Sequence, residues 1–187
     1  MLKQIYRIID WFIPPAMLES DSDRLMARMF VLLHLAGPLM GHSVTFFLAQ
    51  TLAGATWQFW ITEALVASFF AIPLLLRLSG SMRLPAMTSV QMLVRLCLFG
   101  SFYFGGISSP LLPWFLIAMV LGFFYLSESI VLVVTGIALQ LGVFIGTRIF
   151  YGHFPTLLEA SDLQLANTFS ILAALAYMTM LSLFYET

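Results

Sequence analysis

The chain has 187 residues, of which 61% are apolar and only 9% are charged, and its net charge at pH 7 is −1. A soluble domain carries roughly a quarter charged residues and about half apolar ones. This composition therefore excludes a soluble globular protein and indicates an integral membrane protein. The small net charge provides no basic surface for nucleic acid. The single cysteine, Cys97, excludes an intrachain disulfide and any multi-cysteine metal site.

Residues 1–26 are predicted to form an interfacial segment on the cytoplasmic leaflet. Over Lys3–Phe12, aromatic and isoleucine side chains fall on one side of a helix and charged side chains on the other, as in helices that lie on a membrane surface. The proline pair at positions 14 and 15 ends this helix. Ser20 and the acidic residues after it then provide acceptors that cap the next helix. The segment lacks the pattern of a cleaved signal peptide, so we expect it to be retained.

Residues 27–187 are predicted to form an all-α bundle of six transmembrane helices. A bilayer core of ~30 Å needs about 20 apolar residues in a helix. The windows that meet this requirement are Met29–Leu52, Trp57–Leu76, Leu84–Ile107, Leu111–Leu126, Ile130–Tyr151 and Leu163–Tyr185. The fourth window is short, and only Ser127–Ser129 separate it from the fifth. This spacing predicts a tight antiparallel hairpin of the fourth and fifth spans.

The basic residues predict the orientation of the bundle. Most of them fall on one side of the predicted spans: Lys3, Arg7, Arg24, Arg28, Arg77 and Arg83. Because lysine and arginine are retained on the cytoplasmic side, both termini are expected in the cytoplasm. An aromatic belt is expected at the opposite interface, from Trp57, Trp60, Trp114 and Tyr151.

Two ionisable side chains, Glu63 and Arg95, fall inside predicted spans. At 1.5 Å per residue, Glu63 lies ~9 Å and Arg95 ~16 Å below the outer ends of their helices. Charged groups in lipid cost a few kcal/mol and usually mark a function. The favoured interpretation is an ion pair between Glu63 and Arg95, and the alternative is a ligand-binding or proton-binding site.

Further polar residues lie at comparable depth: His42, Gln91, Gln140 and Asn167. If they face inward, they form a cavity for a small polar head group. Hydrogen bonds between helices are the alternative explanation.

Two histidines, His34 and His42, share the first span and are candidate ligands of haem or chlorophyll. A haem with two histidine ligands needs a second helix, and the remaining histidine, His153, falls in a loop. Ordinary hydrogen bonding is therefore the favoured interpretation. The sequence has no phosphate-binding loop, no metal-binding spacing and no nucleophile–base arrangement, so we expect that the chain is not an enzyme and has no metal site or catalytic residues.

Glycines at four-residue spacing occur twice, as Gly37 with Gly41 and as Gly142 with Gly146. This spacing lets helix backbones approach closely. It predicts either packing within the bundle or a dimer contact.

The uncharged loop between the third and fourth spans reads Phe-Gly-Gly-Ile-Ser-Ser-Pro, from Phe104 to Pro110. It resembles the loop of the six-span sensory domains of bacterial sensor histidine kinases, and of similar membrane anchors of nucleotide cyclases, where Gly-Gly-x-x-(Ser/Asn)-Pro joins the same two spans. The Asp10–Pro14 segment, which reads Asp-Trp-Phe-Ile-Pro, is also similar to that group, as are the acidic stretch after it and the two arginines that lead into the first span.

Among these kinases, the redox-responsive RegB-type group has the sequence Gly-Gly-x-x-Asn-Pro-Phe and responds to the quinone pool. Gly105, Gly106 and Pro110 match this pattern, whereas Ser109 stands in place of the Asn and Leu111 in place of the Phe. The resemblance implies a homodimer in the bacterial inner membrane that senses a lipophilic ligand, with quinone as one candidate. It also implies that a transmitter begins just after Glu186.

The residues expected to bind the ligand are Glu63, Arg95, His42, Gly105, Gly106, Ser109, Pro110 and Gln140. An alternative function is that of an accessory subunit of a larger membrane complex, which binds pigment or haem through His34 or His42. A small transporter or channel ranks last, because no inverted repeat or pair of broken helices is evident.

Overall fold

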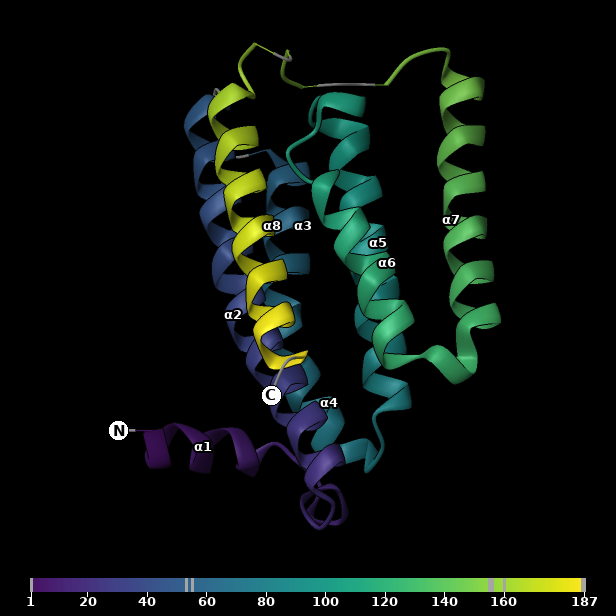
Figure 1. Ribbon diagram of the computed structural model, residues 1–187. Helices are drawn as coiled ribbons and strands as arrows, with labels where there is room; N and C mark the ends of the chain where they lie inside the picture. Colours follow the sequence, from purple (N-terminus) through teal and green to yellow (C-terminus); the bar gives the residue numbers. More distant parts are fainter. Residues whose placement is uncertain (1, 53, 55, 155–156, 160, 186–187) are drawn as a thin grey trace.

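The computed structural model describes residues 2–52, 54, 56–154, 157–159 and 161–185, and every regular element within these ranges is helical (Figure 1). The α-helices are α1 (Leu2–Trp11), α2 (Asp21–Thr51), α3 (Trp57–Ser68), α4 (Ile72–Ser79), α5 (Arg83–Tyr103), α6 (Pro113–Tyr125), α7 (Ile130–Tyr151) and α8 (Gln164–Tyr185). The predicted all-α class is therefore confirmed. The junction with a transmitter, expected after Glu186, lies outside the described residues.

Five helical segments are long and apolar enough to cross a membrane: Asp21–Thr51, Trp57–Ser79, Arg83–Tyr103, Ser127–Tyr151 and Gln164–Leu183. They indicate a membrane-embedded protein. The predicted fourth span corresponds to α6, which has only 13 residues. Such a helix rises about 20 Å, less than the ~30 Å of a bilayer core. It is short because the Gly-Gly loop continues as a turn to Leu112 and the helix begins only at Pro113.

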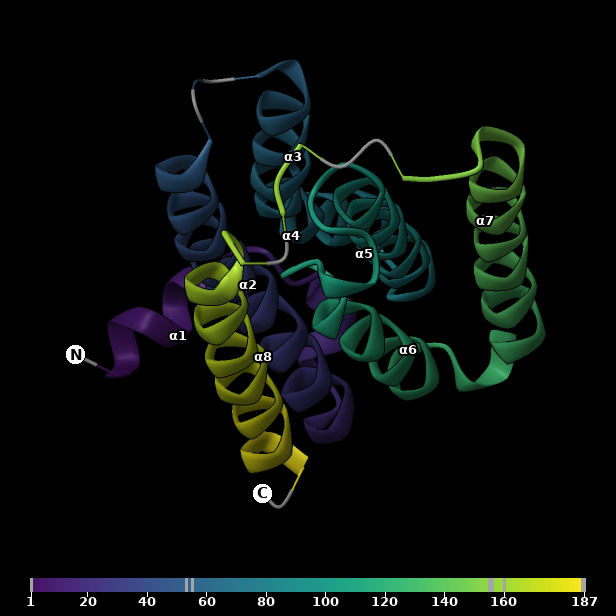
Figure 2. The same ribbon diagram turned by 90° about the horizontal axis from the view of Figure 1, so that it is seen from above.

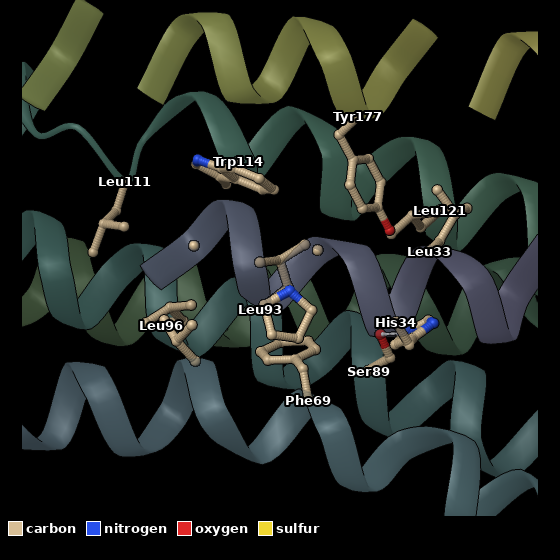
Figure 3. Close-up of a pocket in the computed structure, with 14 residues that line it drawn as sticks. Leu33, His34, Phe69, Ser89, Leu93, Leu96, Leu111, Trp114, Leu121 and Tyr177 are labelled. Atoms are coloured by element: carbon tan, nitrogen blue, oxygen red, sulfur yellow. Dashed lines mark hydrogen bonds between the residues drawn. The ribbon is translucent and has the colours of Figure 1, made fainter. Parts of the chain in front are cut away.

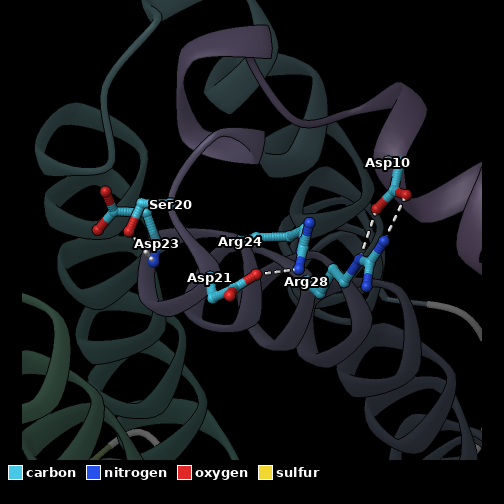
Figure 4. A network of polar contacts seen from close by, with 6 residues as sticks. All are labelled: Asp10, Ser20, Asp21, Asp23, Arg24 and Arg28. Atoms are coloured by element: carbon cyan, nitrogen blue, oxygen red, sulfur yellow. Dashed lines mark hydrogen bonds and ion pairs between the residues drawn. The ribbon is translucent and has the colours of Figure 1, made fainter.

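Helix α1 lies across one end of the bundle, here called the α1 end; the opposite end, which carries the Gly105–Pro110 loop, is called the loop end (Figure 1). Two hydrogen bonds of 2.6 Å join the guanidinium of Arg28 to the carboxylate of Asp10 and fix α1 to α2 (Figure 4). The side chain of Ser20 accepts a hydrogen bond from the backbone N–H of Asp23, which confirms the predicted cap. Helix α2 begins at Asp21, before the predicted domain boundary at residue 27.

The core lies where α2 packs against α3 and α8, and α5 against α4 and α6. Gly37 and Gly41 serve this internal packing. A Cβ atom at Gly37 would lie 3.1 Å from the Tyr177 ring, and one at Gly41 would lie 2.8 Å from Val66. The first glycine pair therefore brings α8 and α3 close to α2, and it does not face a partner outside the chain.

Helix α7 stands apart from the rest of the bundle in both views (Figures 1 and 2). Its connection to α6 through Ser127–Ser129 is short, but α7 packs mainly against α5. The predicted tight hairpin of these two spans is therefore wrong. Gly142 and Gly146 lie on the outlying part of α7, and a Cβ atom at either would meet nothing within 4 Å among the described residues.

Candidate functional site

The polar residues expected at one depth do not converge on a single cavity. They form three separate groups: His42 with Glu63 between α2 and α3, Gln91 with Gln140 between α5 and α7, and Asn167 at the contact of α8 with the loop. Each group links two elements that are already neighbours. The prediction of one polar cavity is therefore replaced by three local contacts.

Glu63 pairs with α2 and not with Arg95. Nδ1 of His42 donates to one carboxylate oxygen of Glu63 at 2.6 Å, and the hydroxyl of Thr45 donates to the other. Within the described part of the chain, no ion pair joins Glu63 to Arg95. The predicted ion pair is wrong because Glu63 lies on the side of α3 that faces α2, whereas Arg95 projects from α5 toward α7.

The ring of His42 is held on one side and open on the other. Its side chain is 34% exposed and stacks on Phe70, with ring centroids 6.2 Å apart. No described residue bonds to Nε2. A carboxylate that holds one imidazole nitrogen while the second stays open is the arrangement that orients a histidine toward a ligand. His42 is thus the histidine of this chain that retains a free ligating atom in the apolar bundle.

His34 is buried, and both of its ring nitrogens are occupied. Nδ1 lies 2.7 Å from the carbonyl oxygen of Phe30 and Nε2 lies 2.5 Å from Oγ of Ser89. Because a carbonyl only accepts, Nδ1 carries a proton and Nε2 of the neutral ring accepts from the Ser89 hydroxyl. A haem or pigment at His34 would have to displace this bond.

His34 lines a cavity of about 50 Å³ at the centre of the bundle, into which the Tyr177 side chain reaches from α8 (Figure 3). This volume is room for water and far below that of a cofactor pocket. Trp114 also lines the cavity and is only 6% exposed. Its predicted place in an interfacial aromatic belt is therefore wrong, whereas Trp57, Trp60 and Tyr151 are all exposed.

Arg95 lines a groove of about 430 Å³ between α5 and α7. Its side chain is exposed, and no described residue lies within ion-pair distance of it. Gln140 and Thr147 line the opposite wall, and aromatic side chains from both helices make up much of the remainder. The groove therefore combines an apolar lining with a single cation.

Gly136 of α7 allows a close contact between α5 and α7 next to this groove. A Cβ atom at Gly136 would lie 2.7 Å from Nε2 of Gln91. The missing side chain lets Gln91 reach α7, where Nε2 of Gln140 donates to its amide oxygen and to the Gly136 carbonyl, the latter at 3.1 Å. An isolated glycine in an apolar window gives no sign of this role in the sequence.

The Gly105–Pro110 loop is fixed in shape by its glycines. Gly105 and Gly106 have φ angles of 90° and 60°, a region that L side chains rarely adopt. A Cβ atom at Gly105 would also lie 2.3 Å from the side chain of Leu163, just before α8. Ser109 is buried, and its hydroxyl accepts from the backbone N–H of Leu111 at 3.3 Å. Gly105, Gly106 and Ser109 fix the conformation of the loop and pack it against the segment before α8, and they line neither the central cavity nor the groove beside Arg95.

Two side chains of α8 bond to backbone carbonyls of the loop. Nδ2 of Asn167 donates to the Ser108 carbonyl at 3.0 Å, and the Ser170 hydroxyl donates to the Pro110 carbonyl. Nε1 of Trp114 donates in turn to Oγ of Ser170 at 3.1 Å. We call these three bonds the loop–α8 latch. The sequence alone does not indicate this role of Ser170, because a serine within an apolar span gives no sign of a contact with a distant loop.

Comparisons of the chain with protein families, curated proteins and solved structures find no match. Among the described residues, no group of three or more His, Cys, Asp or Glu side chains is placed to hold a metal ion. The features of this chain that bear on function are therefore the loop–α8 latch, the groove beside Arg95 and the His42–Glu63 pair.

Proposed function

We propose that the chain is the membrane sensory and anchoring domain of a signal-transduction receptor, and that α8 carries its signal. The observation that supports this proposal is the loop–α8 latch. The loop with the sensor-like sequence bonds to the helix that would lead to an output domain. A ligand that binds two arrangements of the loop unequally would shift α8 through these bonds.

Helix α8 is exposed over much of its length but packs closely on α2, which is its most extensive contact. Only 28% of its most apolar window is buried, and its contacts lie mainly with α2 and α6. Near the loop end, Phe169 stacks on Phe47 of α2 with centroids 3.8 Å apart. Farther along, Tyr177 packs edge-on against Trp114 of α6. Because α8 packs closely on α2, a shift of the loop that moves the start of α8 would be passed along α8 and α2 together.

The proposed topology has six spans, with α6 as a short fourth span and both termini in the cytoplasm. Helix α1 and the last turn of α8 lie toward the same end of the bundle (Figure 1). Arg24, Arg28, Arg77 and Arg83 also belong to element ends on this side. We infer a bacterial inner membrane from the resemblance, and the basic residues at the α1 end support a cytoplasmic location of that end.

A homodimer is proposed to form through α7. This helix is the least buried of the long helices, with 11% of its most apolar window inside the bundle. Gly142 and Gly146 lie on it at the spacing that lets two membrane helices approach closely, and their faces are open. The other glycine pair of this kind is already used inside the chain.

The proposal is tested by joining the chain to a nucleotide cyclase output domain and measuring cyclase activity in vesicles with and without ubiquinone or its reduced form. Replacing both Asn167 and Ser170 by Ala is expected to change the basal output several-fold, because the latch is lost. Thr168→Ala is the matched control, since Thr168 is exposed and bonds only to the Gln164 carbonyl of its own helix. Unchanged output in a correctly inserted double variant would contradict the proposal.

A second candidate function is that of an accessory subunit that binds pigment or haem. The open Nε2 of His42 is the observation that favours it. The absorbance spectrum of protein purified from its native membrane tests this function. A cofactor band that disappears in His42→Ala and persists in His34→Ala would support it, and a protein without such a band would contradict it.

A further inference from the structure

Arg95 lies inside a proposed spanning helix, and no described residue forms an ion pair with it. It lies eight residues before the end of α5 at Tyr103, which places its Cα about 12 Å below the loop end. Its side chain is exposed, and the carboxylate of Glu63, which lies within another apolar helix, is already bonded to His42 and Thr45. A guanidinium keeps its charge in any protein environment, and a charge in hydrocarbon is costly. An anion from the membrane would offset that cost.

The space beside Arg95 has the size of a ligand site. Its volume of about 430 Å³ falls within the range of roughly 300–1,000 Å³ found for small-molecule pockets. Arg95 is the one charged side chain among its described lining residues. The groove exists because α7 is attached to α5 through Gln91, Gln140 and Gly136 and diverges above them.

The walls of the groove match a long hydrocarbon chain. On α7, Leu139 and Val143 line it and are 67% and 68% exposed. On α5, Phe99 and Phe102 face the same space. These surfaces give a chain continuous apolar contact, while the planar guanidinium can hold both oxygens of a carboxylate or two oxygens of a phosphate.

We propose that the groove between α5 and α7 binds an anionic amphiphile, whose carboxylate or phosphate is held by Arg95 and whose hydrocarbon chain lies along α7. Two sources share this chemistry: a free fatty acid and an anionic phospholipid. A neutral lipid or a quinone would leave the guanidinium charge uncompensated, and in a low-dielectric groove that difference favours the anion. The inference deepens the proposed sensory function, since it names the class of the ligand, but binding to the groove can be measured without any signalling output.

The test uses the full chain in nanodiscs of phosphatidylcholine and a fatty acid that carries a photoreactive diazirine group. After irradiation, labelled peptides are identified by mass spectrometry. We expect labelling of α7 around Leu139–Thr147 and of the facing part of α5. Loss of a charged hydrogen-bond partner corresponds to about tenfold to a hundredfold in affinity, so Arg95→Gln is expected to weaken labelling by that factor. Arg95→Lys, which keeps the charge, should restore part of it.

Arg148→Gln is the matched control. Arg148 is a second arginine toward the loop end of α7, but it lies over the Phe154 ring, 5.2 Å from its centroid, and does not line the groove. Its replacement should leave labelling unchanged. Equal labelling in wild type and in a folded Arg95→Gln variant would overturn the proposal, since Arg95 would then only extend toward the interface.

Competition in the wild-type protein gives a second test that needs no variant. Oleate that displaces the label where oleyl alcohol does not would support the proposal with a fatty acid as the source. Displacement by phosphatidylglycerol at lower concentrations than oleate would support it with a phospholipid headgroup as the source. Equal displacement by oleyl alcohol or ubiquinone would overturn it. Because the latch variants report on signalling and this assay on binding, the two proposals can fail independently.

Discussion

The carboxylate of Glu63 and the imidazole of His42 are joined at 2.6 Å between α3 and α2, and the hydroxyl of Thr45 completes the bonding of the carboxylate. The pair is only partly buried, with side-chain exposures of 22% for Glu63 and 34% for His42. Both carboxylate oxygens of Glu63 thus accept hydrogen bonds from α2, and the carboxylate makes no ion pair with Arg95. This pairing leaves Arg95 available to the groove on the other side of the molecule.

Removal of the Glu63 charge is expected to loosen the contact of α2 with α3. Glu63→Ala removes the acceptor of both bonds, and we expect a loss of about 1–2 kcal/mol in the free energy of unfolding, because the bonds are partly open to the surroundings. The measurement is reversible unfolding in detergent. Glu128→Gln, in the exposed turn Ser127–Ser129, is the control and should have little effect. Equal stabilities of both variants would contradict the structural role of the pair.

A side chain at Gly136 is expected to separate α7 from α5. In Gly136→Val, the added Cβ would lie 2.7 Å from Nε2 of Gln91, and the two methyl groups would crowd the amide further. Overpacking of this kind costs about 1–3 kcal/mol. The distance between spin labels on the two helices should increase and the unfolding midpoint should fall. Leu132→Phe is the control, because Leu132 lies on the same helix, is 54% exposed and belongs neither to the contact with α5 nor to the proposed dimer face. An unchanged label distance in Gly136→Val would show that Gly136 does not set the approach of the helices.

Gly105→Ala is expected to disturb the loop and the start of α8 together. The φ angle of 90° is unfavourable for alanine, at about 1–2 kcal/mol, and the added Cβ would meet Leu163. Hydrogen exchange at the first turns of α8 should accelerate, because the latch depends on the position of the loop carbonyls. Gly80→Ala, in the turn between α4 and α5, carries a similar φ of 67° without a neighbour within 4 Å, and it should not affect α8. Unchanged exchange in α8 of Gly105→Ala would mean that the loop and α8 are not coupled.

Bulky residues on the open face of α7 are expected to weaken the dimer. Gly142→Leu together with Gly146→Leu should raise the dimer dissociation constant in bilayers by about tenfold or more, since close backbone approach is lost. Energy transfer between labelled copies measures this equilibrium. Leu132→Phe is the control for added bulk elsewhere on α7, because Leu132 is 54% exposed and does not share the i, i+4 stripe of Gly142 and Gly146. Energy transfer that is unaffected in the double variant would place the dimer contact elsewhere or exclude it.

Several features of this protein could be predicted from the sequence because they depend on neighbours in the chain. Apolar length predicts helices that can cross a membrane. Ser20 caps α2 through an N–H only three residues away, and the loop glycines adopt the positive φ angles that glycine permits. The amphipathic pattern of the first residues likewise agrees with a helix across the end of the bundle (Figure 1).

Only the tertiary structure decided which residues meet. In an apolar membrane helix, nearly every face is hydrophobic, so the sequence pattern does not predict which face packs against the other helices. Glu63 bonds to His42 because the face of α3 that carries Glu63 packs against α2. Trp114 is a core residue because its side chain lies inside the bundle. The divergence of α7 from α6 and the latch on α8 follow from contacts between residues far apart in the chain, and these depend on how the helices pack against one another.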